Sequence, residues 1–291
     1  MDLIYIRRKY RNIRRIIISS FIITVLIYAF LIINHVQAEQ RKDQIFEKDY
    51  EIIGQILKEE ETKKEQELTP KVLNNEEIQK INNIYKTEQK QAFLTFDDGP
   101  SKTVTIPILD LLKQENIKAS FFVLGSRVEL YPDIVKRAYY EGHYIANHGY
   151  SHKYSQIYES KETVLDEYNK TNQAVRNAIG NAIYNTNIFR FPGGSVGGKY
   201  NNIKAEAKDF LEQNNIVSVD WNALNGDSEG LNTEEKLLNR LKETVQNKNS
   251  VVILMHDAGD KKKTYNILPQ IIEYLRQERY EFKTFYDILD K

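Results

Sequence analysis

From residue 92 onward, short apolar runs alternate with amphipathic stretches, and this alternation limits the folds open to the chain. The apolar runs have the length of strands, whereas the stretches between them place apolar residues at helical spacing, as at Ile106, Leu109 and Leu112. Strands that alternate with helices build parallel sheets from βαβ units. About seven such units in about 200 residues favour a closed or nearly closed barrel over an open sheet. We therefore predict an α/β barrel.

The predicted elements follow one another in a regular order. The expected strands are 92–96, 119–123, 143–147, 187–191, 216–221, 250–255 and 281–285, and the expected helices are 106–117, 127–141, 160–178, 202–214, 233–246 and 265–277. Barrel enzymes carry their chemistry at the carboxyl ends of the strands. The candidate residues described below all lie at or just beyond the carboxyl ends of predicted strands.

The N-terminal part of the chain differs in character from the rest. Residues 1–15 are rich in Arg and Lys and precede an uncharged apolar run at residues 16–33, which as a helix would span about 27 Å. We predict a cytoplasmic basic tail, a transmembrane signal-anchor helix and an extracellular remainder, that is, a single-pass protein of the cell membrane. A signal peptide cleaved after Ala38 would instead release a secreted protein, but the length of the apolar run favours the anchor. The charged residues 39–91 are expected to form a helical or disordered stalk before a domain at 92–291.

Composition excludes several classes of function. Lys plus Arg equals Asp plus Glu at 41 each, so the net charge gives no indication of a nucleic-acid partner. The chain has no Cys, which excludes disulfides and thiolate metal sites. A metal site in this protein must therefore use His and carboxylate ligands.

The first predicted strand runs into two adjacent carboxylates, Asp97 and Asp98, and then into Gly99 and Pro100. Successive strand residues point to opposite faces, so one acid can hold a metal while the other serves as a base. Asp and Gly are also common in ordinary turns, and the motif alone leaves both interpretations open.

Two of the five histidines, His148 and His152, follow the third predicted strand and stand four residues apart. One helical turn would put both imidazoles on one face, as two ligands of one metal require. Asp98 would complete a His-His-Asp set with an open position for water, which is the form of catalytic zinc sites.

Arg190 ends the fourth predicted strand and precedes Gly193 and Gly194. An arginine in a partly buried rim needs an acidic partner, and Asp220 and Asp227, which follow the next strand, are both candidates. The glycines allow the backbone to approach a ligand, which suits an N–H group directed at a developing oxyanion.

The strand at 250–255 is strongly apolar and delivers His256 to the same rim. A buried apolar run that ends in His-Asp points to a general acid. Trp221, the only tryptophan, either packs in the core or forms a wall of a small apolar pocket.

Taken together, these stretches resemble the polysaccharide deacetylase family, also known as NodB-homology domains or carbohydrate esterase family 4. The resemblance covers about residue 91 to the C-terminus and rests on five motifs in order: TFDDGP, HxxxH, RxPxG, a Trp/Asp block and LxH. It implies a distorted (β/α)7 barrel that binds Zn²⁺ or a related divalent cation such as Co²⁺.

The resemblance also implies roles for individual residues. Asp97 resembles the general base, and Asp98, His148 and His152 resemble the metal ligands. His256 resembles the acid that protonates the leaving amine.

Further residues would support these groups or bind the substrate. Arg190 resembles the arginine that orients the base, with Asp227 as its acidic support. Leu254 and Trp221 would line the acetyl pocket, and Gly193 would supply a backbone N–H.

Three positions depart from the family pattern. Gly149 stands where Ser or Thr usually follows the first His, so that a supporting hydrogen bond must come from elsewhere. Gly193 stands where an aromatic residue usually follows Pro, which removes a wall of the substrate groove. Ser228 follows Asp227 where Trp is common, which makes the partner of Arg190 less secure.

The implied activity is the hydrolysis of N-acetyl groups on a polysaccharide. For an outward-facing, membrane-tethered domain, the expected substrate is cell-wall peptidoglycan, at N-acetylglucosamine or N-acetylmuramic acid. The alternatives are an O-acetyl esterase, a deacetylase of exopolysaccharide or chitin oligomers, and a non-catalytic carbohydrate-binding relative. Asp97 and His256 argue against the last of these. A glycosidase that uses Asp97 and Asp98 fits poorly, because its carboxylates must flank a bond at a separation of about 5–9 Å.

Overall fold

The computed structural model describes residues 28, 30–37, 41, 48, 51–52, 54–55 and 70–289. These residues belong to two units of the chain, Met1–Thr69 and Pro70–Lys291. Within the described residues, no helix combines the length and the apolar character needed to cross a membrane. The predicted basic tail, most of the predicted span at 16–33 and most of the stalk up to residue 69 lie outside the described residues, so they stay predictions.

A parallel sheet forms the centre of the second unit, and its two longest strands are β1 (Gln91–Asp97) and β7 (Ser250–His256). These strands pair in register from Gln91 opposite Ser250 to Asp97 opposite His256. Both are buried almost throughout, as expected for parallel strands whose two faces are both covered. The register means that Asp97 and His256 leave the sheet side by side.

All strand pairs of the described unit are parallel, which confirms the predicted α/β class. The order across the sheet is β5 (Val217–Ser218), β4 (Ile188–Phe189), β3 (Tyr144–Asn147), β2 (Ser120–Val123), β1, β7 and β6 (Ala223–Leu224), with β8 (Glu281–Lys283) paired to the start of β1. The edge strands β5 and β6 do not pair with each other in the described part, so the barrel is open there. Only residues 219–222 connect these edges, which therefore lie within about 18 Å of each other.

This arrangement fits a distorted (β/α)7 fold and corrects one predicted element. The expected strand at 216–221 is only the two-residue β5, and the chain then crosses to β6 on the other edge. The crossing is anchored by Asn222, whose backbone N–H donates to the Val252 carbonyl oxygen (3.2 Å) and whose side chain binds the backbone of Ser250 and Val252.

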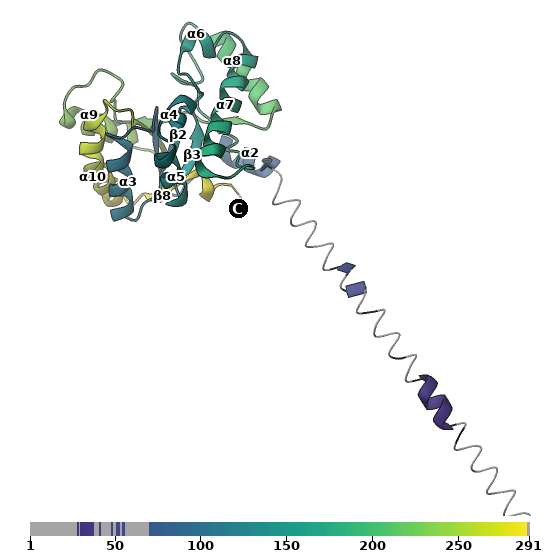
Figure 1. Ribbon diagram of the computed structural model, residues 1–291. Helices are drawn as coiled ribbons and strands as arrows, with labels where there is room; N and C mark the ends of the chain where they lie inside the picture. The colour runs from purple at the N-terminus through teal and green to yellow at the C-terminus, as the bar shows by residue number, and fades with distance from the viewer. Residues whose placement is uncertain are drawn as a thin grey trace, which may run out of the picture. The chain divides into compact units, whose positions relative to one another are not determined.

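Helices cover the face of the sheet that carries Leu94, Phe96 and Ile253. They are α3 (Thr105–Gln114), α4 (Gly125–Leu130), α5 (Pro132–Tyr140), α6 (Tyr154–Ile157), α7 (Lys161–Ile179), α8 (Asn201–Gln213), α9 (Glu234–Val245) and α10 (Lys262–Gln277). In the view of Figure 1, α3, α9 and α10 lie together on the left and α7 with α8 on the right. Their apolar faces are buried, as in α10, where Ile267, Ile271 and Leu275 point inward at helical spacing.

Residues 70–91, which the sequence analysis assigned to the stalk, fold with the sheet. Helix α2 (Asn75–Asn82) begins at an Asn74 cap, and Leu73, Ile81 and Ile84 pack in one cluster with Phe93 of β1. The 3₁₀ helix η1 (Phe285–Asp287) joins the same cluster. Leu73, Ile81 and Ile84 are scattered among charged residues without a helical period, so the sequence pattern does not identify them as core residues.

Candidate metal centre and active site

Three side chains from two loops meet at the carboxyl end of the sheet. Asp98 follows β1, His148 follows β3, and His152 lies farther along the same loop as His148. Asp98 Oδ1 lies 3.6 Å from His148 Nε2 and 3.3 Å from His152 Nε2. The three ligand atoms all lie within 4.8 Å of one another, close enough to bind one ion.

The chemistry of this cluster fits a divalent cation. Asp98 Oδ1 is buried and has no hydrogen-bond partner among the described residues, a costly state for a carboxylate oxygen that no cation neutralises. His148 Nδ1 lies 2.8 Å from the Arg190 carbonyl oxygen, and a proton shared there leaves Nε2 free to bind a metal. Burial lowers the pKa of His148 to about 3, so its ring is the neutral form that metals require. One carboxylate and two imidazoles are a ligand set of catalytic zinc.

The expectation that a helical turn brings the two histidines together is wrong. Residues 148–153 form a loop in which Gly149 (φ 79°) and His152 (φ 56°) adopt left-handed backbone conformations. The Asn147 side chain accepts a hydrogen bond from the Gly149 N–H at 2.9 Å, which fixes the first bend. The two imidazoles therefore converge through the loop conformation and not through helical spacing.

Glu167 of α7 holds the rest of this loop. Its Oε2 accepts hydrogen bonds from the backbone N–H groups of Tyr150 (2.6 Å) and Ser151 (2.7 Å). Gly149 has no side chain to make a supporting hydrogen bond, and Glu167 gives the loop this support from another element.

Asp97 lies beside the cluster and is paired with Arg190. Its Oδ1 accepts a hydrogen bond from Arg190 Nη1 at 2.8 Å, while its Oδ2 lies 3.7 Å from His148 Nε2 and so faces the metal ligands. Burial raises the pKa of Asp97 above its ordinary value, and the charge of Arg190 opposes this effect. A carboxylate with one oxygen fixed by a hydrogen bond and the other facing the metal ligands is well placed to act as a general base.

Arg190 is fully buried, and protein groups satisfy its donors. Besides Asp97, it donates to Thr95 Oγ1 (2.8 Å) and to the carbonyl oxygens of Val219 (3.0 Å) and Asp220 (3.1 Å). These contacts fix the orientation of the guanidinium and, through it, that of Asp97.

His256 is paired with Asp227, which corrects the prediction that Asp227 supports Arg190. Asp227 Oδ1 lies 2.7 Å from His256 Nδ1, and Oδ2 accepts hydrogen bonds from the His256 backbone N–H (2.9 Å) and from Thr264 Oγ1 (2.6 Å). The physical reason is topological, because Asp227 follows β6 and β6 pairs with β7. Asp220 contacts Arg190 only through its backbone carbonyl, and its side chain binds Ser195 instead.

The ion pair sets the protonation of His256. Burial alone would lower its pKa, but the hydrogen bond and charge of Asp227 raise the pKa of His256 to about 9. His256 is therefore cationic at neutral pH and can donate a proton from Nε2.

Gly193 presents a backbone donor at the rim. Its N–H has no acceptor among the described residues, whereas the Gly194 N–H donates to the Phe191 carbonyl oxygen at 2.8 Å. Lys204 binds the Gly193 carbonyl oxygen at 3.3 Å and so holds this peptide in place. The half-buried Trp221 ring lies against Gly194 on one side of the turn.

Comparison with known proteins agrees with this geometry. The sequence profile described as polysaccharide deacetylase matches residues 84–210. A peptidoglycan-N-acetylglucosamine deacetylase of Bacillus cereus is 33% identical over 205 residues, which cover 69% of this chain and 71% of the relative. The chain belongs to the polysaccharide deacetylase family. The family resemblance inferred from the motifs is thereby confirmed, and with it the assignment to hydrolases that act on amide bonds.

Other members of the polysaccharide deacetylase family show the same similarity. The putative polysaccharide deacetylase YheN of Bacillus subtilis is 31% identical, with 81% of this chain and 80% of the relative covered. Among solved structures, a CE4 esterase of Streptococcus mutans superimposes with a TM-score of 0.64 at 31% identity over 73% of this chain and 91% of that one. The catalytic domain of a peptidoglycan N-acetylglucosamine deacetylase from Eubacterium rectale gives 0.63 at 28% identity, with 77% and 95% covered.

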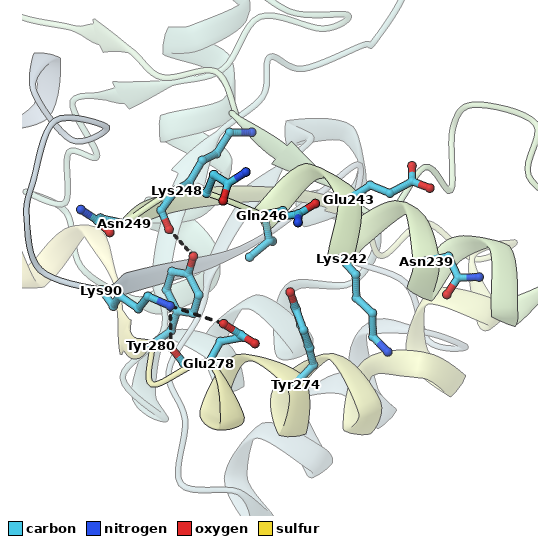
Figure 2. Close-up of a pocket in the computed structure, with 12 residues that line it drawn as sticks. Lys90, Asn239, Lys242, Glu243, Gln246, Lys248, Asn249, Tyr274, Glu278 and Tyr280 are labelled. Carbon is cyan, nitrogen blue, oxygen red and sulfur yellow. Dashed lines mark hydrogen bonds and ion pairs between the residues drawn. The ribbon is translucent and has the colours of Figure 1, made fainter.

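The cleft beside the metal ligands is not the largest cavity in the described part of the chain. The cleft that contains Asp98 and His152 has a volume of about 460 Å³, whereas a cavity of about 1140 Å³ is lined by Tyr139, Tyr144 and Tyr184, and another of about 900 Å³ lies beside the starts of β1 and β7, at the opposite end of the sheet. Figure 2 shows that the cavity beside β1 and β7 is lined by Lys, Tyr and amide side chains, and its charged groups pair locally, as Lys90 does with Glu278. No described histidine lines either of the two larger cavities, so the smaller cleft beside Asp98 and His152 is the candidate active site.

Proposed function

We propose that this chain is a metal-dependent N-deacetylase of peptidoglycan that acts on its N-acetylglucosamine or N-acetylmuramic acid residues. The proposal rests on one observation, the placement of a base and an acid beside the same Asp-His-His cluster. Asp97, held by Arg190, lies next to the ligands, and His256, held by Asp227, leaves the neighbouring strand at the same level. Two relatives named above are peptidoglycan-N-acetylglucosamine deacetylases, which supports the choice of polymer.

Asp98, His148 and His152 would hold the cation, either Zn²⁺ or another divalent metal such as Co²⁺. When bound, such a cation polarises the acetamide carbonyl group and makes water nucleophilic near neutral pH. The Gly193 N–H, which has no acceptor in the described part of the chain, adds a hydrogen bond to the carbonyl oxygen as negative charge develops there.

Asp97 accepts the proton that the attacking water loses. Its Oδ2 faces the ligand cluster, while the hydrogen bond from Arg190 to Oδ1 keeps the carboxylate from rotating. The raised pKa of the buried Asp97 makes it a stronger base than an exposed aspartate.

His256 supplies a proton to the departing sugar nitrogen as the C–N bond breaks, which releases acetate and a free amine. An amine leaving group needs this proton much more than the alcohol of an ester does. The cationic state that Asp227 imposes on His256 therefore favours amide over O-acetyl ester hydrolysis.

The test is acetate release from purified peptidoglycan, from chitin oligomers and from an O-acetylated glycan, each with chelator and with added Zn²⁺. We expect release from peptidoglycan that chelator abolishes and Zn²⁺ restores. Activity on chitin oligomers or esters alone would refute the proposed substrate, and release that is insensitive to chelator would refute the role of the metal.

We further propose that residues 16–33 anchor the enzyme in the cell membrane with the catalytic unit outside. The support is the basic tail followed by an uncharged apolar run. Protease added to intact cells should then remove the catalytic unit from the membrane fraction, and full protection of that unit would contradict this orientation.

A further inference from the structure

The turn at Gly193 and Gly194 lies between two aromatic side chains. A Cβ atom built on Gly194 would lie 3.2 Å from the Trp221 ring, and one built on Gly193 would lie 2.6 Å from the Tyr154 hydroxyl oxygen and 3.2 Å from its Cζ. Both glycines have left-handed φ angles, 75° and 78°. Tyr154 therefore occupies the space that any side chain at 193 would need.

Tyr154 stands between the metal ligands and the free backbone donor. It is the first residue of α6, and its ring centroid lies 5.5 Å from that of His152. The ring is 39% exposed, and within the described part of the chain its hydroxyl group has no hydrogen-bond partner. A tyrosine with an exposed ring and a free hydroxyl offers an apolar face and a polar tip to a bound molecule.

The ring is held from behind and is not a loose surface side chain. Tyr158, which is buried, packs edge-on against it with ring centroids 5.8 Å apart. The Tyr158 hydroxyl donates to the Pro192 carbonyl oxygen at 2.7 Å, which ties α6 to the Gly193 turn. Tyr154 and the Gly193 N–H are thus fixed relative to each other.

We propose that Tyr154 is a substrate-positioning residue that forms the wall of the sugar subsite next to Gly193, where its ring and hydroxyl contact an N-acetylated hexosamine. The inference rests on the proposed function, because it takes the acetamide to lie between the metal ligands and the Gly193 N–H. Gly193 itself supplies no wall to the groove, and in this chain a side chain from another element fills that place. Aromatic faces suit the apolar faces of sugar rings, and a rigid ring loses little entropy when the sugar binds.

Kinetics of Tyr154→Ala and Tyr154→Phe on peptidoglycan fragments test the proposal. We expect Tyr154→Ala to raise KM about tenfold, with kcat within about threefold of wild type and full metal content. Tyr154→Phe keeps the ring and lacks the hydroxyl group, so it should restore the part of the KM change that the ring causes. The matched control is Tyr140→Ala, a tyrosine on α5 that is 67% exposed and far from the candidate residues in the fold, which should leave KM unchanged. An unchanged KM in Tyr154→Ala, or a loss of bound metal, would overturn the inference.

Binding separates this inference from the proposed function. In the Asp97→Asn background, calorimetry with a pentamer of N-acetylglucosamine and with peptidoglycan fragments measures affinity without turnover. If the Tyr154 variant binds as tightly as its parent, the positioning role is refuted and the deacetylase proposal stands. If the parent binds neither probe and the wild type releases no acetate, the proposed function fails and the inference with it.

A steric test checks the geometry independently of activity. Gly193→Ala introduces left-handed strain and a contact with Tyr154, whereas Gly198→Ala, at φ 74° with no atom near its Cβ position, introduces the strain alone. We expect Gly193→Ala to lower the melting temperature more than Gly198→Ala does, and the excess to vanish in the Tyr154→Ala background. An excess that persists without the tyrosine ring would contradict the proposed contact.

Discussion

Replacement of Asp227 by Asn isolates the group that keeps His256 protonated. Asp227 makes a 2.7 Å contact with the His256 ring and also accepts hydrogen bonds from the His256 backbone and from Thr264. The amide keeps the shape of the side chain and removes its charge. The remaining influences on the ring are burial, which lowers the pKa of a histidine, and the charges of Asp97 and Asp98, which raise it.

The size of the effect follows from the pKa of His256. A pKa of about 9, against an ordinary value of 6.5, corresponds to about 3 kcal/mol of stabilisation of the cation. Without the Asp227 charge the pKa should fall to about 6.5 or lower, so that at most about 3% of the rings are protonated at pH 8 instead of about 90%. We therefore expect kcat/KM of Asp227→Asn to fall at least about thirtyfold at pH 8 and by a smaller factor at pH 6.

The assay is the pH profile of acetate release between pH 5.5 and 10, with metal content measured at each end. In wild type the alkaline limb should fall near pH 9, and in the variant it should move below pH 7. The matched control is Asp260→Asn, which removes an exposed carboxylate four residues after His256 and should leave the profile unchanged. An unmoved alkaline limb, or an equal loss at pH 6 and pH 8, would refute the claim that Asp227 acts through the charge of His256.

Three further predictions address the metal, the loop and stability. Asp98→Ala should be purified without bound Zn²⁺, and full metal content in this variant would disprove the ligand assignment. Asp97→Asn should keep the metal, but its kcat should fall about 10²–10⁴-fold. Glu167→Ala should weaken Zn²⁺ affinity about 10–100-fold in chelator competition, because the His152 loop loses two hydrogen bonds, and unchanged affinity would count against this support. Since the pKa of His256 is raised in the folded state, the contribution of its protonation to stability is complete below pH 6.5 and is lost as pH rises through about 9. The melting temperature of the wild type should therefore fall over this pH range, and that of Asp227→Asn should not.

The parallel fold and the metal cluster were predictable because both depend on local patterns. Apolar runs that end in Asp97 or His256 identify central strands, and parallel strands necessarily bring their carboxyl ends to one edge. His148 and Asp98 follow such strands, so their convergence needed no detailed coordinates.

The partners of these residues were less predictable because they depend on tertiary contacts. The pairing of Asp227 with His256 requires β6 beside β7, and β6 is a two-residue strand that leaves no period in the sequence. Glu167 lies on α7 like any other charged helical residue, and Thr95 lies inside an apolar strand. Their roles arise only when the loop after β3 and the guanidinium of Arg190 reach them.

The charges of the site explain why a cation belongs where the three ligands meet. Asp97 is neutralised by Arg190, and Asp227 by His256, each within 2.8 Å. Among the described residues Asp98 forms ion pairs only with imidazole nitrogens, and one of its oxygens is buried without a hydrogen bond. A cation held by Asp98 would therefore compensate a buried carboxylate that the two ion pairs leave unpaired, without disturbing the base or the acid. The lowered pKa of His148 suits this position for the same reason. A protonated His148 would place a positive charge beside Asp98 and so compete with the metal cation for that carboxylate.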